Sequence, residues 1–214
     1  MKHRHPMPFG SQPLEAGGVR FCLWAPSVLC VRLQIEGEQT ASVAMQAHAD
    51  GWHRLELATA ATGTRYRFVL PDGLRVPDPA ARCNPDDVHG ASEVIDALAF
   101  DWRDADWRDA DWRGRPWSQA VIYELHVGSF SPGGDFAGVQ ARLDYLESLG
   151  VMAIELMLVA DFPGQRNWGY DGVLLFAPDA RYGRPDDLKR LVAATYARLL
   201  HSQHAVLAER KPRG

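Results

Sequence analysis

The sequence predicts an antiparallel β-sandwich followed by the first βα units of a parallel α/β barrel. Two observations on hydrophobic periodicity support this fold class. Residues 18–70 contain short segments in which apolar and polar side chains alternate, the pattern of half-buried strands. Residues 120–200 instead alternate apolar strands with helical patterns, as parallel sheets covered by helices do. The change of pattern near Ala120 therefore marks a change of architecture.

Length and composition are those of a globular protein. The chain has 214 residues, 46% hydrophobic and 23% charged, enough for one large or two ordinary domains. Its net charge of −4 gives no electrostatic reason to expect nucleic acid or a membrane as partner. No apolar run resembles a signal peptide or a membrane span, so we expect a cytoplasmic protein. Cys22, Cys30 and Cys83 are widely spaced, which favours reduced thiols over a disulfide or a metal site.

The first module is expected to cover residues 1–100, with its strands within residues 10–76. Val19, Phe21 and Leu23 share one face of a strand, and the same alternation recurs twice before turn residues near Asp72. Several half-buried strands at this spacing predict a small β-sandwich. Two tryptophans in this module invite a second interpretation. Trp24 and Trp52 could form a sugar-stacking platform, but core packing is the role we expect.

Two segments are predicted to be irregular. Residues 76–87 are rich in proline and aspartate and are expected to be an extended linker. Residues 101–117 repeat the unit Asp-Trp-Arg-Asp-Ala, and a period of five matches neither strand nor helix. We interpret the repeat as a duplication in a surface linker. The alternative is an aromatic ligand stripe of Trp102, Trp107 and Trp112, which helical geometry would spread apart.

The second module is expected to span residues 118–200. Residues 121–127 are apolar on both faces apart from Glu124 and His126, as in a strand buried in a parallel sheet. A helix follows and ends at Gly150, and residues 151–157 form a second buried strand. The apolar face of that helix consists of Val139, Leu143, Leu146 and Leu149.

Pro185 opens another helix, with Asp186 and Asp187 placed favourably in its first turn. Alternating strands and helices after a β-module predict a (β/α) barrel, whose chemistry lies on the loops after the strands. Residues 201–214 do not continue this pattern and are expected to be a solvated tail. The apolar face of the last helix consists of Leu188, Leu191, Val192, Thr195 and Leu199.

Several motifs together resemble a family of glycosidases. They are Tyr-Glu-Leu-His-Val-Gly-Ser-Phe at 123–130, Ala-Asp-Phe-Pro-Gly at 160–164, Asn-Trp-Gly-Tyr-Asp-Gly at 167–172 and Tyr-Gly-Arg-Pro-Asp-Asp-Leu at 182–188. The chain resembles the maltooligosyltrehalose trehalohydrolases of the α-amylase family of glycoside hydrolases. The resemblance implies an immunoglobulin-like β-sandwich ahead of an incomplete (β/α)8 TIM barrel. Branching enzymes of glycogen share part of the motif set.

The resemblance also implies a function and a binding site. A full-length relative would hydrolyse the α-1,4 bond next to the terminal trehalose of maltooligosyltrehalose and release trehalose. Its substrate-binding residues would match Trp168, Tyr170 and Asp171, with Tyr170 stacked on a sugar ring. An aromatic face covers the apolar face of a pyranose, so this role is chemically reasonable. The implied partner is an α-glucan or maltooligosyltrehalose, and no cofactor or metal is implied.

The catalytic residues of the family have no counterpart in this sequence. Retaining glycosidases need two carboxyl groups ~5 Å apart, and in the family both come from strands beyond the second helix. The expected Asp-x-x-x-Asn-His motif is also absent, so we expect a truncated or frame-shifted chain without catalytic carboxylates. Glu124, Glu155 and His126 could form a local acid/base cluster, although barrel-strand charges usually bond to neighbouring layers. His201 and His204 have metal-compatible spacing but no third ligand.

Two further hypotheses stay open. The chain could be a non-catalytic α-glucan-binding protein that uses the tryptophans of the sandwich and the loop around Trp168. It could also pair with a separately encoded remainder of the barrel. In the truncated chain that we expect, two parallel strands cannot close a barrel, so their open edges and apolar faces would be exposed to water.

Overall fold

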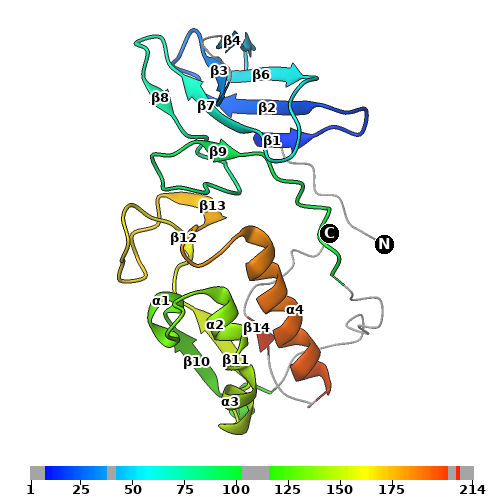
Figure 1. Cartoon of the computed structure of the whole chain (residues 1–214), viewed down its shortest axis with the longest axis vertical. Helices are drawn as coiled ribbons and strands as arrows, with labels where there is room; N and C mark the ends of the chain where they lie inside the picture. Colours follow the sequence, from blue (N-terminus) through cyan, green and yellow to red (C-terminus); the bar gives the residue numbers. More distant parts are fainter. Residues whose placement is uncertain (1–7, 38–41, 103–115, 202–205, 208–214) are drawn as a thin grey trace. The chain divides into compact units, whose positions relative to one another are not determined.

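The computed structural model describes residues 8–37, 42–102, 116–201 and 206–207, which form two compact units (Figure 1). The first unit consists of the described residues up to Phe100, joined by residues 160–164 and 172–180. The second consists of the described residues in 101–159, 165–171 and 181–214. The chain therefore passes between the units at 100/101, 159/160, 164/165, 171/172 and 180/181.

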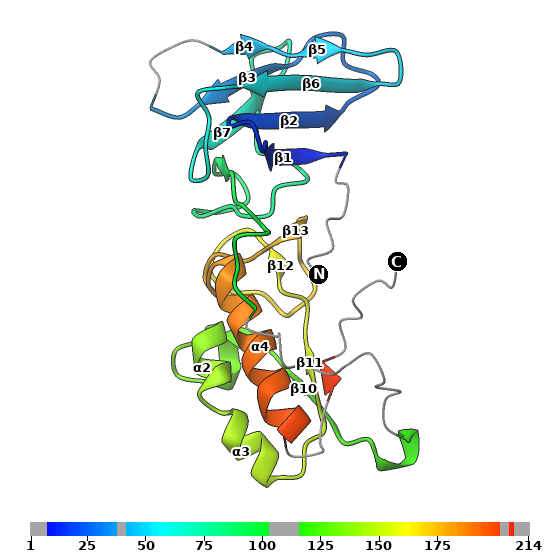
Figure 2. The same ribbon diagram turned by 90° about the vertical axis from the view of Figure 1, so that its right-hand side faces the viewer.

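Two antiparallel sheets build the first unit (Figure 2). The first has the order β1 (Gly10–Pro13), β2 (Val19–Trp24), β6 (Trp52–Leu57) and β5 (Gln46–Ala47). The second has the order β4 (Val43–Ala44), β3 (Arg32–Ile35), β7 (Arg65–Val69) and β8 (Arg75–Val76), and β9 (Ser92–Glu93) also pairs with β7. The strands expected in residues 10–76 are thus present.

Side chains from both sheets form one core. Val19, Phe21 and Leu23 of β2 are buried with Tyr66 and Phe68 of β7. The alternation of these residues in the sequence is confirmed, because in each strand every second side chain enters the core. Burial of each such large side chain stabilises the fold by about 1.5–3 kcal/mol.

The segment expected to be an extended linker is instead part of the first unit. Asp78 is fully buried, and its carboxylate accepts a hydrogen bond of 2.7 Å from the Tyr66 hydroxyl. The Asp78 backbone donates to the Ser92 hydroxyl at 2.9 Å, and that hydroxyl donates to Asn84 Oδ1 at 2.9 Å. Proline and aspartate prevent regular structure here. The side chains nevertheless satisfy one another in a buried polar network.

A β-hairpin from the later part of the chain also belongs to the first unit. Strands β12 (Ala160–Asp161) and β13 (Leu174–Pro178) pair antiparallel, with a register irregularity at β12. Leu174 and Ala177 are buried against Val88. The Gly164 backbone N–H donates to Asp87 Oδ2 at 3.0 Å. The sequence pattern had placed this hairpin within the second module, and the module boundaries drawn from that pattern remain predictions.

A parallel sheet lies in the second unit. Strand β10 (Ile122–Leu125) pairs with β11 (Ala153–Leu156), and β11 pairs with the short strand β14 (Val206–Leu207). Both predicted strands are therefore present. The expected burial of β10 on both faces is wrong, because Ile122 and Tyr123 are 45% and 37% exposed. Among the described strands only β11 pairs with β10, so one edge of β10 stays open, as we expected of strands that cannot close a barrel. Val206 and Leu207, within the expected tail, pair parallel with β11.

Helices cover this sheet. The helix predicted to end at Gly150 is two helices, α2 (Phe136–Gln140) and α3 (Leu143–Ser148), preceded by the short α1 (Val127–Phe130). Asp135 caps α2, since its side chain accepts from the Gly138 N–H at 2.7 Å. Leu149 lies beyond the end of α3 and is exposed, which corrects its predicted place on the apolar face.

Helix α4 (Pro185–His201) begins as predicted, with Asp186 and Asp187 in its first turn, and it packs against α2. Both views show α4 beside α2 and α3 (Figures 1 and 2). Leu191 and Thr195 are buried as expected, whereas the side chain of Leu199 lies outside the described part of the chain. No helix of the described residues combines the length and the apolar character that a membrane crossing requires.

Candidate functional site

The loop of residues 165–171 in the second unit presents two aromatic side chains. Trp168 is 82% exposed and Tyr170 is 73% exposed, and Asp171 is exposed beside them. Two large aromatic rings two positions apart on one loop give an accessible apolar surface of the kind that ligand sites use. Three substrate-binding residues predicted from the sequence therefore lie together on one accessible loop.

Asn167 anchors this loop at its start. Its Oδ1 lies 2.9 Å from His126 Nε2 and accepts hydrogen bonds of 3.2 Å from the Tyr182 hydroxyl and the Gly169 N–H. The protonated Nε2 of His126 is the donor in the first contact. One carboxamide oxygen thus joins the end of β10, the aromatic loop and the segment before α4.

Tyr182 is the structural support of that contact. Its ring is buried and meets the rings of Phe136 and His126 edge to face, both at centroid distances of 6.0 Å. The Tyr182 carbonyl accepts from the Phe136 N–H at 2.8 Å. Because the ring is held on both sides, its hydroxyl is fixed under Asn167.

Gly169 lets the loop pass close to Met157, the residue after β11. Its φ of +82° is a left-handed conformation, and an added Cβ would lie 2.7 Å from Met157 Cε and 3.0 Å from Met157 Cβ. A side chain at this position would be strained and would collide with Met157. The glycine between Trp168 and Tyr170 therefore sets the path of both aromatic residues.

Two buried polar atoms next to this anchor have no partner among the described residues. They are Nδ1 of His126 and Nδ2 of Asn167. Nδ1 accepts a hydrogen bond when Nε2 carries the proton, and Nδ2 is a donor, so each atom can bind a water. His126 also lines an open hollow of about 470 Å³ with Tyr123, Phe130 and Tyr145.

The residues of the possible acid/base cluster lie near one another, since Glu124 and His126 line the same hollow. Glu124 and Glu155 are register partners on β10 and β11, and both are exposed. His126 contacts Asn167 and Tyr182, and within the described chain it makes no hydrogen bond to either glutamate. The metal hypothesis for His201 and His204 lies outside the described side chains.

A pair of buried carboxyl groups lies in the first unit. Asp161 on β12 and Asp179 after β13 are 1% and 2% exposed. Burial and the neighbouring Asp179, followed by Asp87, raise the pKa of Asp161 to about 7. Two carboxyl groups in contact favour one shared proton. Asp179 Oδ2 accepts from the Phe162 N–H at 3.3 Å, which ties the pair to the hairpin backbone.

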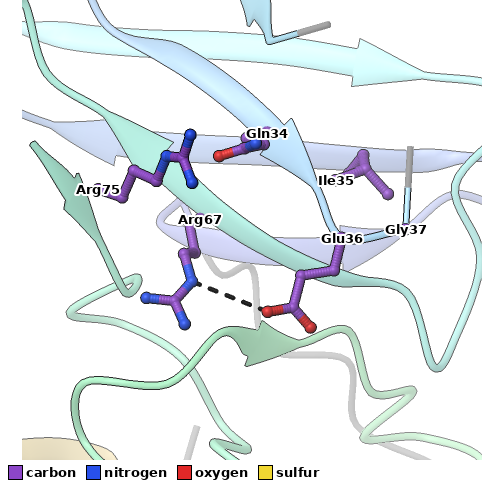
Figure 3. Close-up of a pocket in the computed structure, with 6 residues that line it drawn as sticks. All are labelled: Gln34, Ile35, Glu36, Gly37, Arg67 and Arg75. Carbon is purple, nitrogen blue, oxygen red and sulfur yellow. Dashed lines mark ion pairs between the residues drawn. The ribbon is translucent and has the colours of Figure 1, made fainter. Parts of the chain in front are cut away.

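An arginine-lined pocket of about 400 Å³ lies on the second sheet of the first unit (Figure 3). Arg67 and Arg75 flank it, and Arg67 Nε lies 3.9 Å from Glu36 Oε1. Arg67 also donates to the His89 carbonyl at 2.8 Å. This pocket presents charge rather than aromatic faces, and no motif in the sequence singled it out.

The tryptophans of the first unit are not where we expected them. The prediction that Trp24 packs in the core is wrong, because its side chain is 59% exposed. Trp52 is only partly buried. Both lie on the sheet face opposite the core. Of the repeat tryptophans, Trp102 is partly buried, whereas Trp107 and Trp112 lie outside the described residues.

Sequence reasoning did not identify Asn167 and Tyr182 as anchors of the loop. Both residues belong to motifs that we had singled out, but the spacing of the sequence does not indicate that residues 126, 167 and 182 are in contact. One local signal was present: Asn167 precedes Gly169 by two positions, the arrangement in which an asparagine side chain bonds to the backbone of a turn.

Several known proteins are similar to this chain in sequence. The family model of the alpha-amylase catalytic domain matches residues 77–201. A malto-oligosyltrehalose trehalohydrolase of Deinococcus radiodurans is 45% identical over 188 residues, which cover 87% of this chain and 30% of that protein. A 1,4-alpha-glucan branching enzyme of Kitasatospora aureofaciens is 35% identical over 199 residues, covering 87% of this chain and 26% of that enzyme.

Solved structures agree with this result. The crystal structure of a candidate alpha amylase from Salmonella typhimurium is 43% identical with a TM-score of 0.81, covering 95% of this chain and 32% of that one. A pullulanase of Paenibacillus barengoltzii, solved with maltohexaose and alpha-cyclodextrin, has a TM-score of 0.76 at 22% identity, covering 95% of this chain and 37% of that one. That second likeness shows the fold alone. The chain spans about a third or less of the length of the curated relatives that it matches.

Proposed function

The chain belongs to the alpha-amylase family of glycoside hydrolases, and on that premise we propose that it supplies the sugar-binding wall of a trehalose-releasing glycosidase. In the complete enzyme the reaction would be hydrolysis of the α-1,4 bond next to the terminal trehalose of maltooligosyltrehalose. A cytoplasmic location and the immunoglobulin-like and barrel domains are part of this proposal. The relatives named malto-oligosyltrehalose trehalohydrolase, 45% identical in the case of Deinococcus radiodurans, support it.

The observation that carries the proposal is the exposure of Trp168 and Tyr170 on an anchored loop. A pyranose ring has an apolar face of C–H groups, and an aromatic ring that covers it removes both surfaces from water. Because Asn167 and Gly169 fix the loop beforehand, little conformational entropy is lost when a sugar binds. Asp171, exposed next to Tyr170, can accept hydrogen bonds from sugar hydroxyls.

These residues can bind and orient a sugar but do not cleave it. Cleavage with retention needs a nucleophile and a general acid/base ~5 Å apart, and the sequence has no Asp-x-x-x-Asn-His motif. Loss of a general acid/base alone removes roughly 10²–10⁴-fold in rate. We therefore expect the 214-residue chain to bind glucan without releasing trehalose. Trehalose release by the purified chain at ordinary enzyme rates would contradict this expectation.

Calorimetric titration of the chain with maltohexaose tests the binding proposal. Tyr170→Ala and Trp168→Ala should each weaken binding about tenfold, since each removes one stacking surface. Trp117→Ala is the matched control, because Trp117 is 81% exposed and lies outside the loop. Equal affinities for all three variants, or absence of binding by the parent chain at millimolar sugar, would reject the proposal.

A second candidate function follows from the open edge of β10. Val121 and Ile122 are 49% and 45% exposed beside an edge that pairs with no other described strand. The open edge favours a chain that complements a separately encoded remainder of the barrel. A branching-enzyme-like member of the family is a further candidate, because the chain is 35% identical to the branching enzyme of Kitasatospora aureofaciens. A polypeptide that corresponds to the rest of the Deinococcus radiodurans relative should then co-purify with the chain. Substitution of Ile122 by Asp should abolish the association.

A further inference from the structure

Trp24 and Trp52 lie directly opposite each other on neighbouring strands. The register of β2 and β6 pairs the two residues at the end of the sheet. Phe21 and Leu23 point into the core, so the alternation of β2 places Trp24 on the other face. Opposite residues of an antiparallel pair share a face. The two indoles therefore stand side by side on the outer face of the first sheet.

Both indoles are held in place by polar contacts. Trp24 Nε1 donates to the Asp50 carbonyl at 3.3 Å. The guanidinium of Arg54 lies over the Trp52 ring, 5.8 Å from its centroid, and pairs with Asp50 Oδ2 at 3.2 Å. The turn at Gly51 brings these groups together, since an added Cβ there would lie 3.2 Å from Trp24 Nε1. The pair is thus fixed before any ligand arrives.

The surroundings of the pair are polar and carry little net charge. Arg54 is compensated by Asp50, and further along the same face Arg20 is opposite Glu56. A protein partner would need a wider apolar patch at the centre of its interface than two adjacent rings. A neutral ligand with apolar ring faces and many hydroxyl groups matches two indoles with a hydrogen-bonding ion pair beside them.

We propose that Trp24 and Trp52 form a second carbohydrate-binding surface, which binds the pyranose rings of an α-1,4-glucan. The identity of the glucan rests on the proposed function, whereas the surface itself does not depend on the loop at Trp168. Trp24, 59% exposed, supplies the open stacking face, and Asp50 with Arg54 supplies hydrogen bonds to the hydroxyls. This assigns a binding role to two tryptophans for which we had expected core packing.

Affinity electrophoresis of the full chain in gels that contain soluble amylose tests the proposal. Trp24→Ala and Trp52→Ala should each reduce retardation about tenfold in apparent affinity, and Trp168→Ala should leave the remaining affinity of this surface intact. Trp117→Ala, which removes another exposed indole, should behave as the parent chain. Circular dichroism confirms that the variants are folded.

The four variants separate this proposal from the proposed function. If only Trp168→Ala weakens retardation, the second surface does not bind glucan and the proposal is overturned, while the first site stands. If only Trp24→Ala and Trp52→Ala weaken it, the second surface stands and the first site fails. A folded Trp24→Phe variant distinguishes loss of stacking from a disturbed fold, because phenylalanine keeps an aromatic face at this position. It should retain most of the retardation, and equal loss in Trp24→Phe and Trp24→Ala would overturn stacking as the cause.

Discussion

The imidazole Nε2 of His126 lies 2.9 Å from the carboxamide Oδ1 of Asn167, 41 positions later in the chain. This contact joins the residue after β10 to the loop that carries Trp168 and Tyr170. The Tyr182 hydroxyl approaches the same oxygen at 3.2 Å. The orientation of the aromatic loop therefore depends on a three-residue contact within the second unit.

Replacement of Asn167 by Ala should loosen the loop without unfolding the unit. The substitution removes the shared acceptor, and the Tyr182 hydroxyl and His126 Nε2 lose a buried partner, which costs about 1–3 kcal/mol. Amide hydrogen exchange should rise in residues 165–171 and change little in α4. Gln165→Ala, in the same loop but exposed, is the control. Unchanged exchange in the loop would show that the contact does not hold it.

Gly169→Ala should destabilise the chain more than Gly164→Ala. Both glycines have a left-handed φ, +82° and +84°, so both substitutions carry a conformational cost of about 1 kcal/mol. Only at Gly169 would the new methyl group collide, with Met157, whereas nothing lies within 4 Å at Gly164. Urea unfolding of the two variants measures the difference. Equal losses would mean that Met157 moves aside freely.

Stability of the first unit should fall as the pH rises from 5 to 8. The pKa of Asp161 is raised to about 7 by burial and by Asp179, so the folded state binds the proton more tightly than the unfolded chain does. A raised pKa stabilises the fold at low pH, and that contribution is lost as the pH rises through 7. The loss should be about 2 kcal/mol between pH 5 and pH 8.

Urea unfolding at several pH values measures this dependence. Asp161→Asn should flatten it, because the amide keeps the shape of the protonated acid and does not ionise. The exposed Asp171→Asn should leave the dependence unchanged. A stability that rises between pH 5 and pH 8 in the parent chain would contradict the shared proton.

Tyr66→Phe should weaken the first unit through Asp78. The substitution keeps the ring contacts with Phe21 and Phe68 but removes the hydroxyl that donates to Asp78 Oδ2 at 2.7 Å. Burial already raises the pKa of Asp78, and the Tyr66 hydrogen bond opposes that rise. The expected loss is about 1–3 kcal/mol by urea unfolding. Tyr145→Phe, at a half-exposed ring, should cost nothing measurable.

Periodicity predicted the strands well, because the position of each side chain follows directly from the pleat. The alternation also places Trp24 on the same face of β2 as Arg20, opposite the face of Phe21 that enters the core. The expectation of core packing followed the general burial of tryptophan and overrode the local pattern. The break between α2 and α3 was not predictable, since Val139, Leu143 and Leu146 keep helical spacing across it.

The candidate site was only partly predictable. Trp168, Tyr170 and Asp171 stand close together in one motif, so the motif resemblance was enough to place them on one loop. Asn167 and Tyr182 act through tertiary contacts that spacing does not encode. The same holds for Gly164 and Asp87, which are 77 positions apart and fix the hairpin to the first unit.

The repeated passage of the chain between the two units limits how this protein can be divided. Residues 160–164 and 172–180 belong with the first unit, but the loop between them belongs with the second. A polypeptide that ends at Phe100 would lack Leu174 and Ala177, so Val88 would lose its buried apolar partners. A transfer of the first unit to another protein therefore has to include this hairpin as well, because the residues that form the unit are discontinuous in the gene.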